Sequence, residues 1–318
     1  MTGSNPPYDT QIRPYGIAAI AEAAALIRAG QTVAVPTETV YGLAADATDS
    51  AAVARIYEAK GRPGFNPLIV HVIDRAAAGE LARFDATAEA LAAAFWPGPL
   101  TLVLPRAPGG PVASLATAGL ATIALRCPAH PAMRALLVAC GRPLAAPSAN
   151  ASGRISPTRA EHVATSLSGR IPLILDAGPT ARGLESTIVA PGAGMIRLLR
   201  PGPVTAEALT AATGLPVETV IAGDAIEAPG QLASHYAPSK PLRLEADRAC
   251  PGEWLIGFGA IAGDATLSAT GDLVEAAARL FDLLHQADAS EAAGIAIAPI
   301  PRSGLGAAIN DRLARAAA

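Results

Sequence analysis

The sequence predicts an α/β protein with a mixed sheet, followed by a smaller C-terminal α/β domain. The chain of 318 residues exceeds one ordinary domain, and 51% of its residues are hydrophobic against 16% charged, which is enough to form more than one core. Several strand-like runs follow one another with connections too short for a helix, so some neighbouring strands are expected to be antiparallel. Residues 215–241 are rich in Pro, Gly and Ala and predict a linker between residues 1–214 and 242–318.

The first elements follow from apolar spacing and from capping residues. Apolar residues at helical spacing predict a helix over residues 17–29, which ends at Gly30, and the run TVAVP at residues 32–36 predicts a buried strand. Asp49 is placed to cap a second helix that runs out at Lys60. Lys60 is therefore expected at a helix end.

The remaining elements alternate along the chain. Strands are predicted at residues 68–72, 101–104, 122–126, 143–146, 171–175, 187–189 and 195–199. Helices are predicted near residues 86–95, 131–140, 159–167 and 205–213. Beyond the linker, the sequence predicts a strand at 254–258, a helix at 272–286, a strand at 294–300 and a closing helix at 305–316.

Composition excludes several classes of protein. Cys127, Cys140 and Cys250 are odd in number and widely spaced, so we predict neither a disulfide framework nor a metal site and interpret them as core residues. Residues 1–16 are polar, and the longest apolar run, residues 91–105, is broken by two prolines. Neither a signal peptide nor a membrane span is therefore indicated, and a cytoplasmic protein is expected.

Charge is distributed unevenly between the two parts. Residues 1–205 hold 17 Lys and Arg against 13 Asp and Glu, whereas residues 206–318 hold 7 against 14. An anionic ligand is therefore sought in the first part. The chain contains only two lysines, Lys60 and Lys240. Lys60 is either a solvated lysine at a helix C-terminus or a compact cation with a task that a planar guanidinium cannot perform; Lys240 is interpreted as the former.

Three familiar sequence motifs are not supported. GFGAIA at residues 257–262 has the glycine spacing of a dinucleotide-binding turn, but the next predicted helix begins only near Asp272, so its amides would not meet a pyrophosphate. We interpret this segment as a plain turn. The sequence also contains no P-loop and no GxSxG elbow.

Seven polar clusters interrupt the otherwise apolar sequence, and most flank predicted strands. They are PTETVYG at 36–42, KGRPGFNP at 60–67, TIALR at 122–126, PSAN at 147–150, GRISPT at 153–158, ESTIV at 185–189 and LLRPG at 198–202. Ser156 and Thr158 also have a plain explanation as helix-start residues. Because loops at strand ends gather ligand groups and buried polar residues need partners, the clusters together predict one shared cleft.

Taken together, PTETVYGL, the K-x-R-P at residues 60–63, NPLIVH at 66–71, PSAN and ESTIV resemble the YrdC-like family of threonylcarbamoyl-AMP synthases. HYAP at 235–238 and the closing GLGAAINDRLARAA resemble the long form of this family with a C-terminal extension. The resemblance implies a twisted sheet around a concave, positively charged cleft and a Rossmann-like extension. It also implies a nucleotidyltransferase that converts L-threonine, bicarbonate or CO2, and ATP into L-threonylcarbamoyl-AMP and diphosphate, the first step towards N6-threonylcarbamoyladenosine in tRNA. Mg2+ is expected with ATP, and tRNA or tRNA-modification proteins are expected as partners.

The resemblance also assigns positions to the two larger substrates. The ATP-binding positions are Lys60, Arg62, Asn66, Thr122, Ser148, Asn150, Ser156, Arg200 and Tyr236. The L-threonine positions are Thr39, His71, Arg126, Ala146 and Ser186. Lys60 and Arg62 are the catalytic candidates and, with Arg200, are expected to neutralise the leaving diphosphate, since the reaction needs no protein nucleophile.

Individual assignments carry their own expectations. Arg126 suits the amino-acid carboxylate because a guanidinium binds it through two hydrogen bonds, and Ala146 offers only its backbone. His71 is alternatively a core histidine in a strand. The linker reads A-P-G-Q-L-A-S-H-Y-A-P where the family has a pattern near S-P-G-M-K-Y-R-H-Y-A-P, which leaves His235 and Tyr236 as lid candidates.

Two other functions compete with a synthase. A concave basic surface also suits an RNA-binding module, but the sequence pI of about 6.0 and the 4% aromatic content disfavour a dedicated RNA binder. A carbamoyltransferase that uses carbamoyl phosphate would differ in that it needs no ATP.

Overall fold

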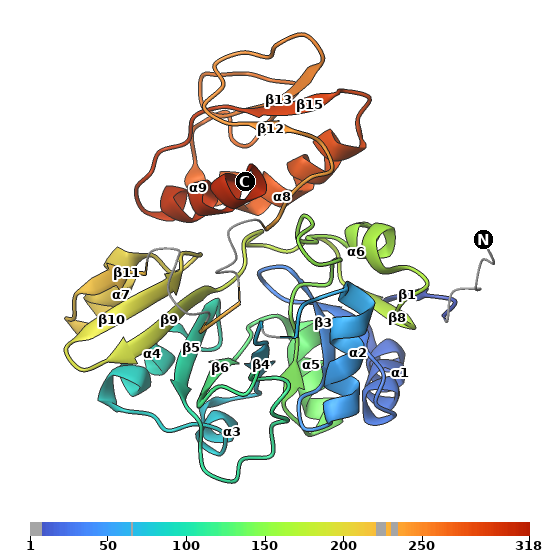
Figure 1. Ribbon diagram of the computed structural model, residues 1–318, viewed down its shortest axis with the longest axis vertical. Helices are drawn as coiled ribbons and strands as arrows, with labels where there is room; N and C mark the ends of the chain where they lie inside the picture. The colour runs from blue at the N-terminus through green and yellow to red at the C-terminus, as the bar shows by residue number, and fades with distance from the viewer. Residues whose placement is uncertain (1–7, 65, 221–226, 230–234) are drawn as a thin grey trace.

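The computed structural model describes residues 8–64, 66–220, 227–229 and 235–318. Figure 1 shows a larger unit built around a long sheet and a smaller unit, in orange and red, that lies beside it. The middle of the predicted linker, residues 221–226 and 230–234, lies outside the described residues. Of the described helices, none is long and apolar enough to span a bilayer.

The larger unit holds most of the elements. Its helices are α1 (Ile17–Arg28), α2 (Ser50–Lys60), α3 (Arg75–Gly79), α4 (Ala86–Phe95), α5 (Pro131–Cys140), α6 (Ala160–Leu167) and α7 (Ala206–Thr213). Its strands are β1 (Gln11–Pro14), β2 (Val33–Pro36), β3 (Tyr41–Asp46), β4 (Ile69–His71), β5 (Leu100–Pro105), β6 (Thr122–Arg126), β7 (Leu144–Ala145), β8 (Leu173–Asp176), β9 (Thr187–Gly192), β10 (Met195–Arg200) and β11 (Val217–Thr219).

The described strands of the larger unit form one sheet in the order β1-β8-β2-β3-β7-β4-β6-β5-β9-β10-β11. The sheet is mixed: β4 runs parallel to β6, whereas β5 runs antiparallel to it. This confirms the predicted fold class. β11 pairs with β10 inside the region predicted as linker, so the sheet continues past residue 214.

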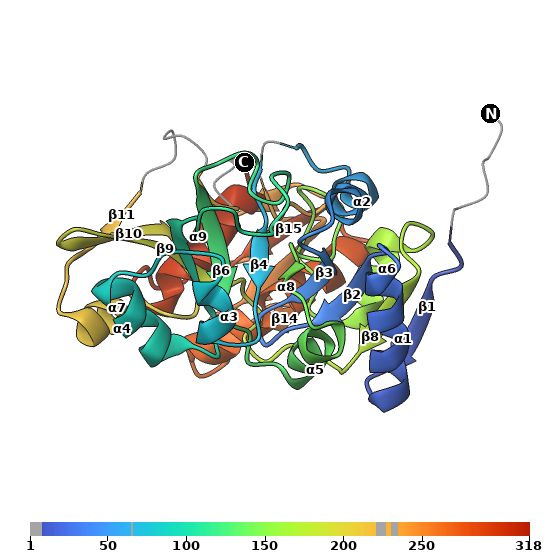
Figure 2. The same ribbon diagram turned by 90° about the horizontal axis from the view of Figure 1, so that it is seen from below.

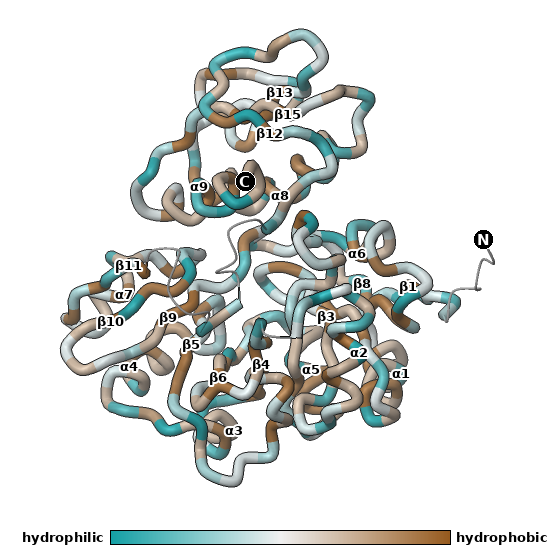
Figure 3. Tube along the Cα trace, in the orientation of Figure 1, coloured by the Kyte–Doolittle hydropathy of each residue, from teal (hydrophilic) through white to brown (hydrophobic). Residues whose placement is uncertain are grey.

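The sheet is covered on both faces, as the alternation of β2 shows. Val33 and Val35 pack in a core with α1 and α5, whereas Ala34 packs in the other core with α2 and α6. Successive strand residues point to opposite faces, so a short apolar strand supplies both cores. Figure 2 shows α1 and α5 on one side of β2 and β3 and α2 on the other, and Figure 3 shows hydrophobic stretches along β4, β5 and β6.

Capping residues fix the two ends of α2. The Asp49 side chain accepts a hydrogen bond from the Ala51 amide at 2.8 Å, and Gly61 ends the helix in the left-handed conformation, with φ of 60°. Both follow the predicted caps. Lys60 is thereby the last helical residue, and the K-x-R-P segment begins at once.

The smaller unit contains β12 (Leu242–Arg243), β13 (Glu253–Gly257), β14 (Ala265–Thr266), α8 (Leu273–Ala289), β15 (Gly294–Ile297) and α9 (Leu305–Ala316). Its strands are all parallel, in the order β12-β15-β13-β14, as an α/β unit requires. The GFGAIA segment forms a turn in which Phe258 pairs with Ile261, and α8 begins only at Leu273, which confirms the interpretation as a turn.

Helices α8 and α9 face the larger unit in Figure 1 and supply the contacts between the two units. Arg159 forms an ion pair with Asp282 at 2.7 Å, and the rings of His162 and His285 stack with centroids 3.8 Å apart. The structure corrects one sequence interpretation: Cys250 is exposed rather than part of a core.

Candidate active site

A cavity of about 540 Å3, including its mouth, opens where the predicted polar clusters meet. Its walls come from residues 37–42, from β4 and β6, from residues 146–148, from residues 185–186 and from Arg200, with His235 and Tyr236 closing one side. Segments far apart in the sequence therefore share one hollow, as the clusters predicted.

Strand alternation aims His71 and Arg126 into this cavity. The two residues are directly paired across the parallel strands β4 and β6, so their side chains leave the sheet on the same face. Their neighbours Val70 and Leu125 point the other way into the core. The apolar residues of these strands thus fix the direction of the two polar ones.

Arg126 is buried and held on three sides. It donates to the Thr39 hydroxyl at 2.9 Å and to the Gly98 carbonyl at 3.3 Å, and it forms an ion pair with Glu38 at 2.6 Å. Burial opposes ionisation of Glu38, but the charge and the hydrogen bond of Arg126 hold the pKa of that carboxyl below its ordinary value. The guanidinium is therefore preorganised at the cavity wall.

His71 is fully buried beside this pair. Burial, together with the nearby Arg126 charge, lowers its pKa to about 3. Its ring is therefore neutral at physiological pH. Its Nδ1 atom has no hydrogen-bond partner, although a buried polar atom normally has one.

Arg200 projects from the end of β10 and is also fixed by the chain. It donates to the Ser186 carbonyl at 2.9 and 3.1 Å and to the Ser186 hydroxyl at 3.2 Å. The approach depends on Gly202, because a Cβ atom there would lie 2.5 Å from the Thr187 amide nitrogen. LLRPG and ESTIV are thereby packed against each other at the cavity.

Lys60 lies in the wall rather than on the lining. Its Nζ atom donates to the Ser148 carbonyl at 2.6 Å, to the Asn150 carbonyl, and to the Asn150 side-chain oxygen at 3.3 Å. The three ammonium donors thus meet three acceptors of the PSAN loop. Burial, with the nearby Arg62 charge, holds the pKa of Lys60 well below its ordinary value. Lys60 is not a solvated lysine at the end of its own helix, and its ammonium fixes PSAN.

Lys240 behaves differently from Lys60. It donates to the Ala287 carbonyl at 3.0 Å and to Ser290, at the C-terminal end of α8. Its position at a helix C-terminus agrees with the prediction, although the helix lies in the smaller unit and Lys240 is half-buried rather than solvated.

The lining carries a clear excess of positive charge. Among the described lining residues, Arg62, Arg126 and Arg200 are cationic and Glu185 is anionic. Arg62 donates to the Pro67 carbonyl at 3.1 Å, and burial lowers its pKa to about 10, so it stays charged at neutral pH. Three guanidinium groups around one hollow suit an anionic ligand.

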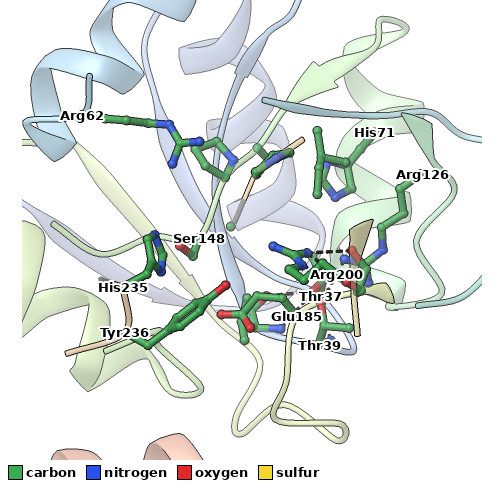
Figure 4. Close-up of a pocket in the computed structure, with 17 residues that line it drawn as sticks. Thr37, Thr39, Arg62, His71, Arg126, Ser148, Glu185, Arg200, His235 and Tyr236 are labelled. Carbon is green, nitrogen blue, oxygen red and sulfur yellow. Dashed lines mark hydrogen bonds between the residues drawn. The ribbon is translucent and has the colours of Figure 1, made fainter. Parts of the chain in front are cut away.

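The predicted positions fall into two groups. Those on the lining are Arg62, Ser148, Arg200 and Tyr236 of the ATP set, and Thr39, His71, Arg126, Ala146 and Ser186 of the threonine set. In Figure 4 the labelled threonine-set residues lie on one side of the cavity, Arg62, Ser148 and Tyr236 lie on the other, and Arg200 lies between.

The other predicted positions lie behind the lining or away from it. Lys60 and Asn150 support Ser148, and Ser156 donates to Glu185. Asn66 is buried next to Arg62, which donates to its carbonyl at 3.4 Å. Thr122 begins β6 opposite Pro105 and is not among the lining residues.

Among the described lining residues with polar side chains, Thr37 and Glu185 have no role assigned from the sequence. Both belong to predicted polar clusters, which was the available signal. The residue type at 185 does not itself indicate a phosphate site, because a carboxylate among bound phosphates is unfavourable unless its charge is balanced.

The lining is also short of internal hydrogen-bond partners. Over the described part of the chain, five buried side-chain atoms have none, and three of these belong to the lining residues His71, His235 and Tyr236. Unsatisfied buried polar groups are costly, so their concentration here indicates a site completed by a ligand.

The donor set does not fit a resident metal ion. No group of three or more His, Cys, Asp or Glu side chains with suitable placement is found among the described residues. Glu185, the carboxylate on the lining, has its oxygens engaged by Ser156 and Arg312.

The fold and the site thus define an α/β protein with one cationic, partly closed small-molecule cavity between its strand ends. The family model Sua5_yciO_yrdC, described as "Telomere recombination", matches residues 25–202. A second model, described as "Threonylcarbamoyl-AMP synthase, C-terminal domain", matches residues 204–318.

Relatives of the whole chain give the same result. The chain is 41% identical to the threonylcarbamoyl-AMP synthase of Bacillus subtilis, over 94% of this chain and 92% of that protein. It is 41% identical to the enzyme of the same name from Pyrococcus abyssi, over 92% of each chain. A crystal structure of P. abyssi Sua5 complexed with L-threonine superposes with a TM-score of 0.87, at 38% identity and over 97% of each chain. The chain belongs to the threonylcarbamoyl-AMP synthase family, in its long form with a C-terminal domain.

Proposed function

We propose that this chain is an L-threonylcarbamoyladenylate synthase, which converts L-threonine, bicarbonate or CO2, and ATP into L-threonylcarbamoyl-AMP and diphosphate. The observation that carries the proposal is the single cavity on which nine of the positions assigned to ATP and threonine lie. The named relatives, which match over more than nine-tenths of this chain, support it.

The reaction depends on the positioning of its substrates and needs no protein nucleophile. The neutral amine of threonine adds to CO2 and loses a proton, which gives a carbamate. A carbamate oxygen then attacks the α-phosphorus of ATP, and the bond from that phosphorus to the bridging oxygen of diphosphate breaks. Holding the two reactants in line converts a collision of separate molecules into a reaction within one complex.

The threonine half is proposed to lie against Arg126. The Thr39 hydroxyl and the Glu38 carboxylate hold the guanidinium in place, so the substrate carboxylate meets a fixed donor rather than a mobile one. The unpartnered Nδ1 of neutral His71 is available for a further hydrogen bond to the amino acid.

The triphosphate is proposed to lie between Arg62 and Arg200. A cation about 4 Å from a phosphate oxygen contributes about 4 kcal/mol at an effective dielectric constant of about 20, before desolvation is counted. Because backbone carbonyls already orient both guanidinium groups, little reorganisation is needed as negative charge moves onto the departing diphosphate. Lys60 contributes by fixing Ser148 and Asn150.

Mg2+ is proposed to enter bound to the ATP phosphates, since ATP-dependent enzymes usually hold it through substrate oxygens and few protein ligands. We place the end of the catalytic unit after β11, at residue 219, and assign residues 242–318 to the C-terminal domain. We also propose a cytoplasmic location and tRNA-modification proteins as recipients of the product.

Diphosphate release with substrates omitted one at a time tests the function. The expected result is release only when ATP, L-threonine and bicarbonate are all present. Release without bicarbonate would contradict the proposal, and product formed from carbamoyl phosphate without ATP would indicate a carbamoyltransferase. A tRNA mobility shift without ATP turnover would indicate the RNA-binding alternative.

A further inference from the structure

Glu185 is a carboxylate on the lining of a cavity that is proposed to hold a triphosphate. It is buried, with 6% of its surface exposed, and it shares the cavity with Arg62 and Arg200. A free carboxylate there would repel the phosphates and would compete with them for the arginines. The chain must therefore balance this charge if the site is to bind a nucleotide.

The balancing group comes from the smaller unit. Arg312, on α9, is fully buried, and its Nε atom donates to one Glu185 oxygen at 2.8 Å. The other Glu185 oxygen accepts from the Ser156 hydroxyl. Both carboxylate oxygens are thus directed into hydrogen bonds behind the lining.

Arg312 touches two further segments of the cavity wall. Its Nη2 atom donates to the Pro201 carbonyl at 2.9 Å, next to Arg200, and its guanidinium carbon lies 5.1 Å from the centre of the Tyr236 ring. Its Nη1 atom pairs with Asp311 at 2.6 Å. One side chain of the C-terminal domain therefore contacts ESTIV, LLRPG and HYAP together.

We propose that Arg312 is a positioning residue for nucleotide binding: by pairing with Glu185 it removes the one negative charge on the described lining and holds that carboxylate away from the phosphates. The inference rests on the proposed function, because it assumes that the cavity binds ATP. It assigns the C-terminal domain a direct part in forming the nucleotide site.

Protonation of Glu185 gives the proposal a measurable signature. The charged or titratable groups that act on it are Arg312 on α9, Arg200 on β10, and His235 and Tyr236, and Asp311 pairs with the other side of Arg312. Burial raises the pKa of the carboxyl, whereas the charges of Arg312 and Arg200 lower it, and the balance holds it below its ordinary value. Without Arg312 the pKa of Glu185 rises, so a larger fraction of the carboxyl is protonated at low pH. As the pH is raised, Glu185 ionises and repels the phosphates.

The test uses the full-length chain and the non-hydrolysable probe α,β-methylene-ATP, with calorimetric binding at pH 6 and pH 8. We expect Arg312→Met to raise the Kd about tenfold or more at pH 8 and less at pH 6, because Glu185 is then partly protonated. Arg312→Met with Glu185→Gln is expected to bind within about threefold of wild type at both pH values, since the charge is gone. Arg312→Lys keeps the charge and is expected to lie between wild type and Arg312→Met.

Arg159→Met is the matched control, because Arg159 also forms an ion pair across the two units, with Asp282, but lies away from the lining. It is expected to leave the Kd unchanged. An unchanged Kd for Arg312→Met at both pH values would overturn the proposal, as would a double variant that binds as weakly as Arg312→Met. Unfolding of both the single and the double variant, judged by circular dichroism, would reduce Arg312 to a structural contact. Failure of wild type to bind the probe would instead count against the proposed function.

Discussion

Replacement of Lys60 by methionine tests whether the Lys60 ammonium holds the cavity wall in place. Methionine keeps most of the apolar stem but removes the ammonium, which donates to Ser148 and twice to Asn150. The two carbonyl acceptors of the PSAN loop then lose their partners inside the protein. Because Ser148 lies on the cavity lining, the loss is expected to shift the lining itself.

The magnitude follows from the hydrogen bonds. The two hydrogen bonds from this charged donor to backbone carbonyls contribute about 1.5–3 kcal/mol each, or about 3–6 kcal/mol together. The third, to the Asn150 side-chain oxygen, is the longest at 3.3 Å and is left out of this sum. The substitution also removes the desolvation penalty of a buried ammonium, which offsets several kcal/mol of this loss. The free energy of unfolding is therefore expected to fall by only about 1–3 kcal/mol. Activity is more sensitive, because a displacement of about 1 Å at a reacting site costs about 100-fold in rate.

Diphosphate release and urea unfolding together test this expectation, with Lys240→Met as the matched control. Lys240 also donates to backbone carbonyls, but at the end of α8 in the smaller unit. We expect Lys60→Met to be folded and at least about 100-fold slower, and Lys240→Met to lose similar stability with full activity. Wild-type rates for Lys60→Met would refute the role of Lys60 in holding PSAN.

Three further outcomes are expected. Arg126→Ala should raise the KM for threonine about tenfold or more and the KM for ATP less, and equal effects on both titrations would reassign Arg126. The pKa of His71 is about 3 in the folded chain and 6.5 ordinarily. As the pH falls, the unfolded chain therefore binds a proton at this residue before the folded chain does. About 2 kcal/mol of the stability that His71 contributes is therefore lost between pH 7 and pH 5, and His71→Asn should remove that share of the pH dependence of urea unfolding. The shares of His162 and His235, whose pKa values are also lowered to about 3, should remain. Chelation of divalent ions should abolish turnover without lowering the Tm, whereas a lowered Tm would indicate a structural metal.

The sequence predicts elements well where the signal is local. The cap at Asp49 and the left-handed Gly61 place α2, and apolar spacing places α9. It misses β3, because YGLAAD is buried along its whole length and shows neither alternation nor helical spacing. It also misses the edge strands β1 and β11, whose three or four residues are defined by the strand beside them.

The candidate site is also predictable from the sequence only in part. Motif resemblance assigned its positions, and strand alternation is consistent with His71 and Arg126 sharing a face. The sequence does not reveal that the Lys60 ammonium points at carbonyl oxygens rather than into the cavity. Nor does it reveal the pairing of Glu185 with Arg312, since the two residues lie 127 positions apart and meet only through the packing of two units.

A crystal structure of the chain with α,β-methylene-ATP and L-threonine tests the central claim most directly. We expect both molecules in the one cavity, with the threonine carboxylate on Arg126 and the phosphates between Arg62 and Arg200. Density for the two ligands in separate places, or threonine bound away from Arg126, would contradict the account.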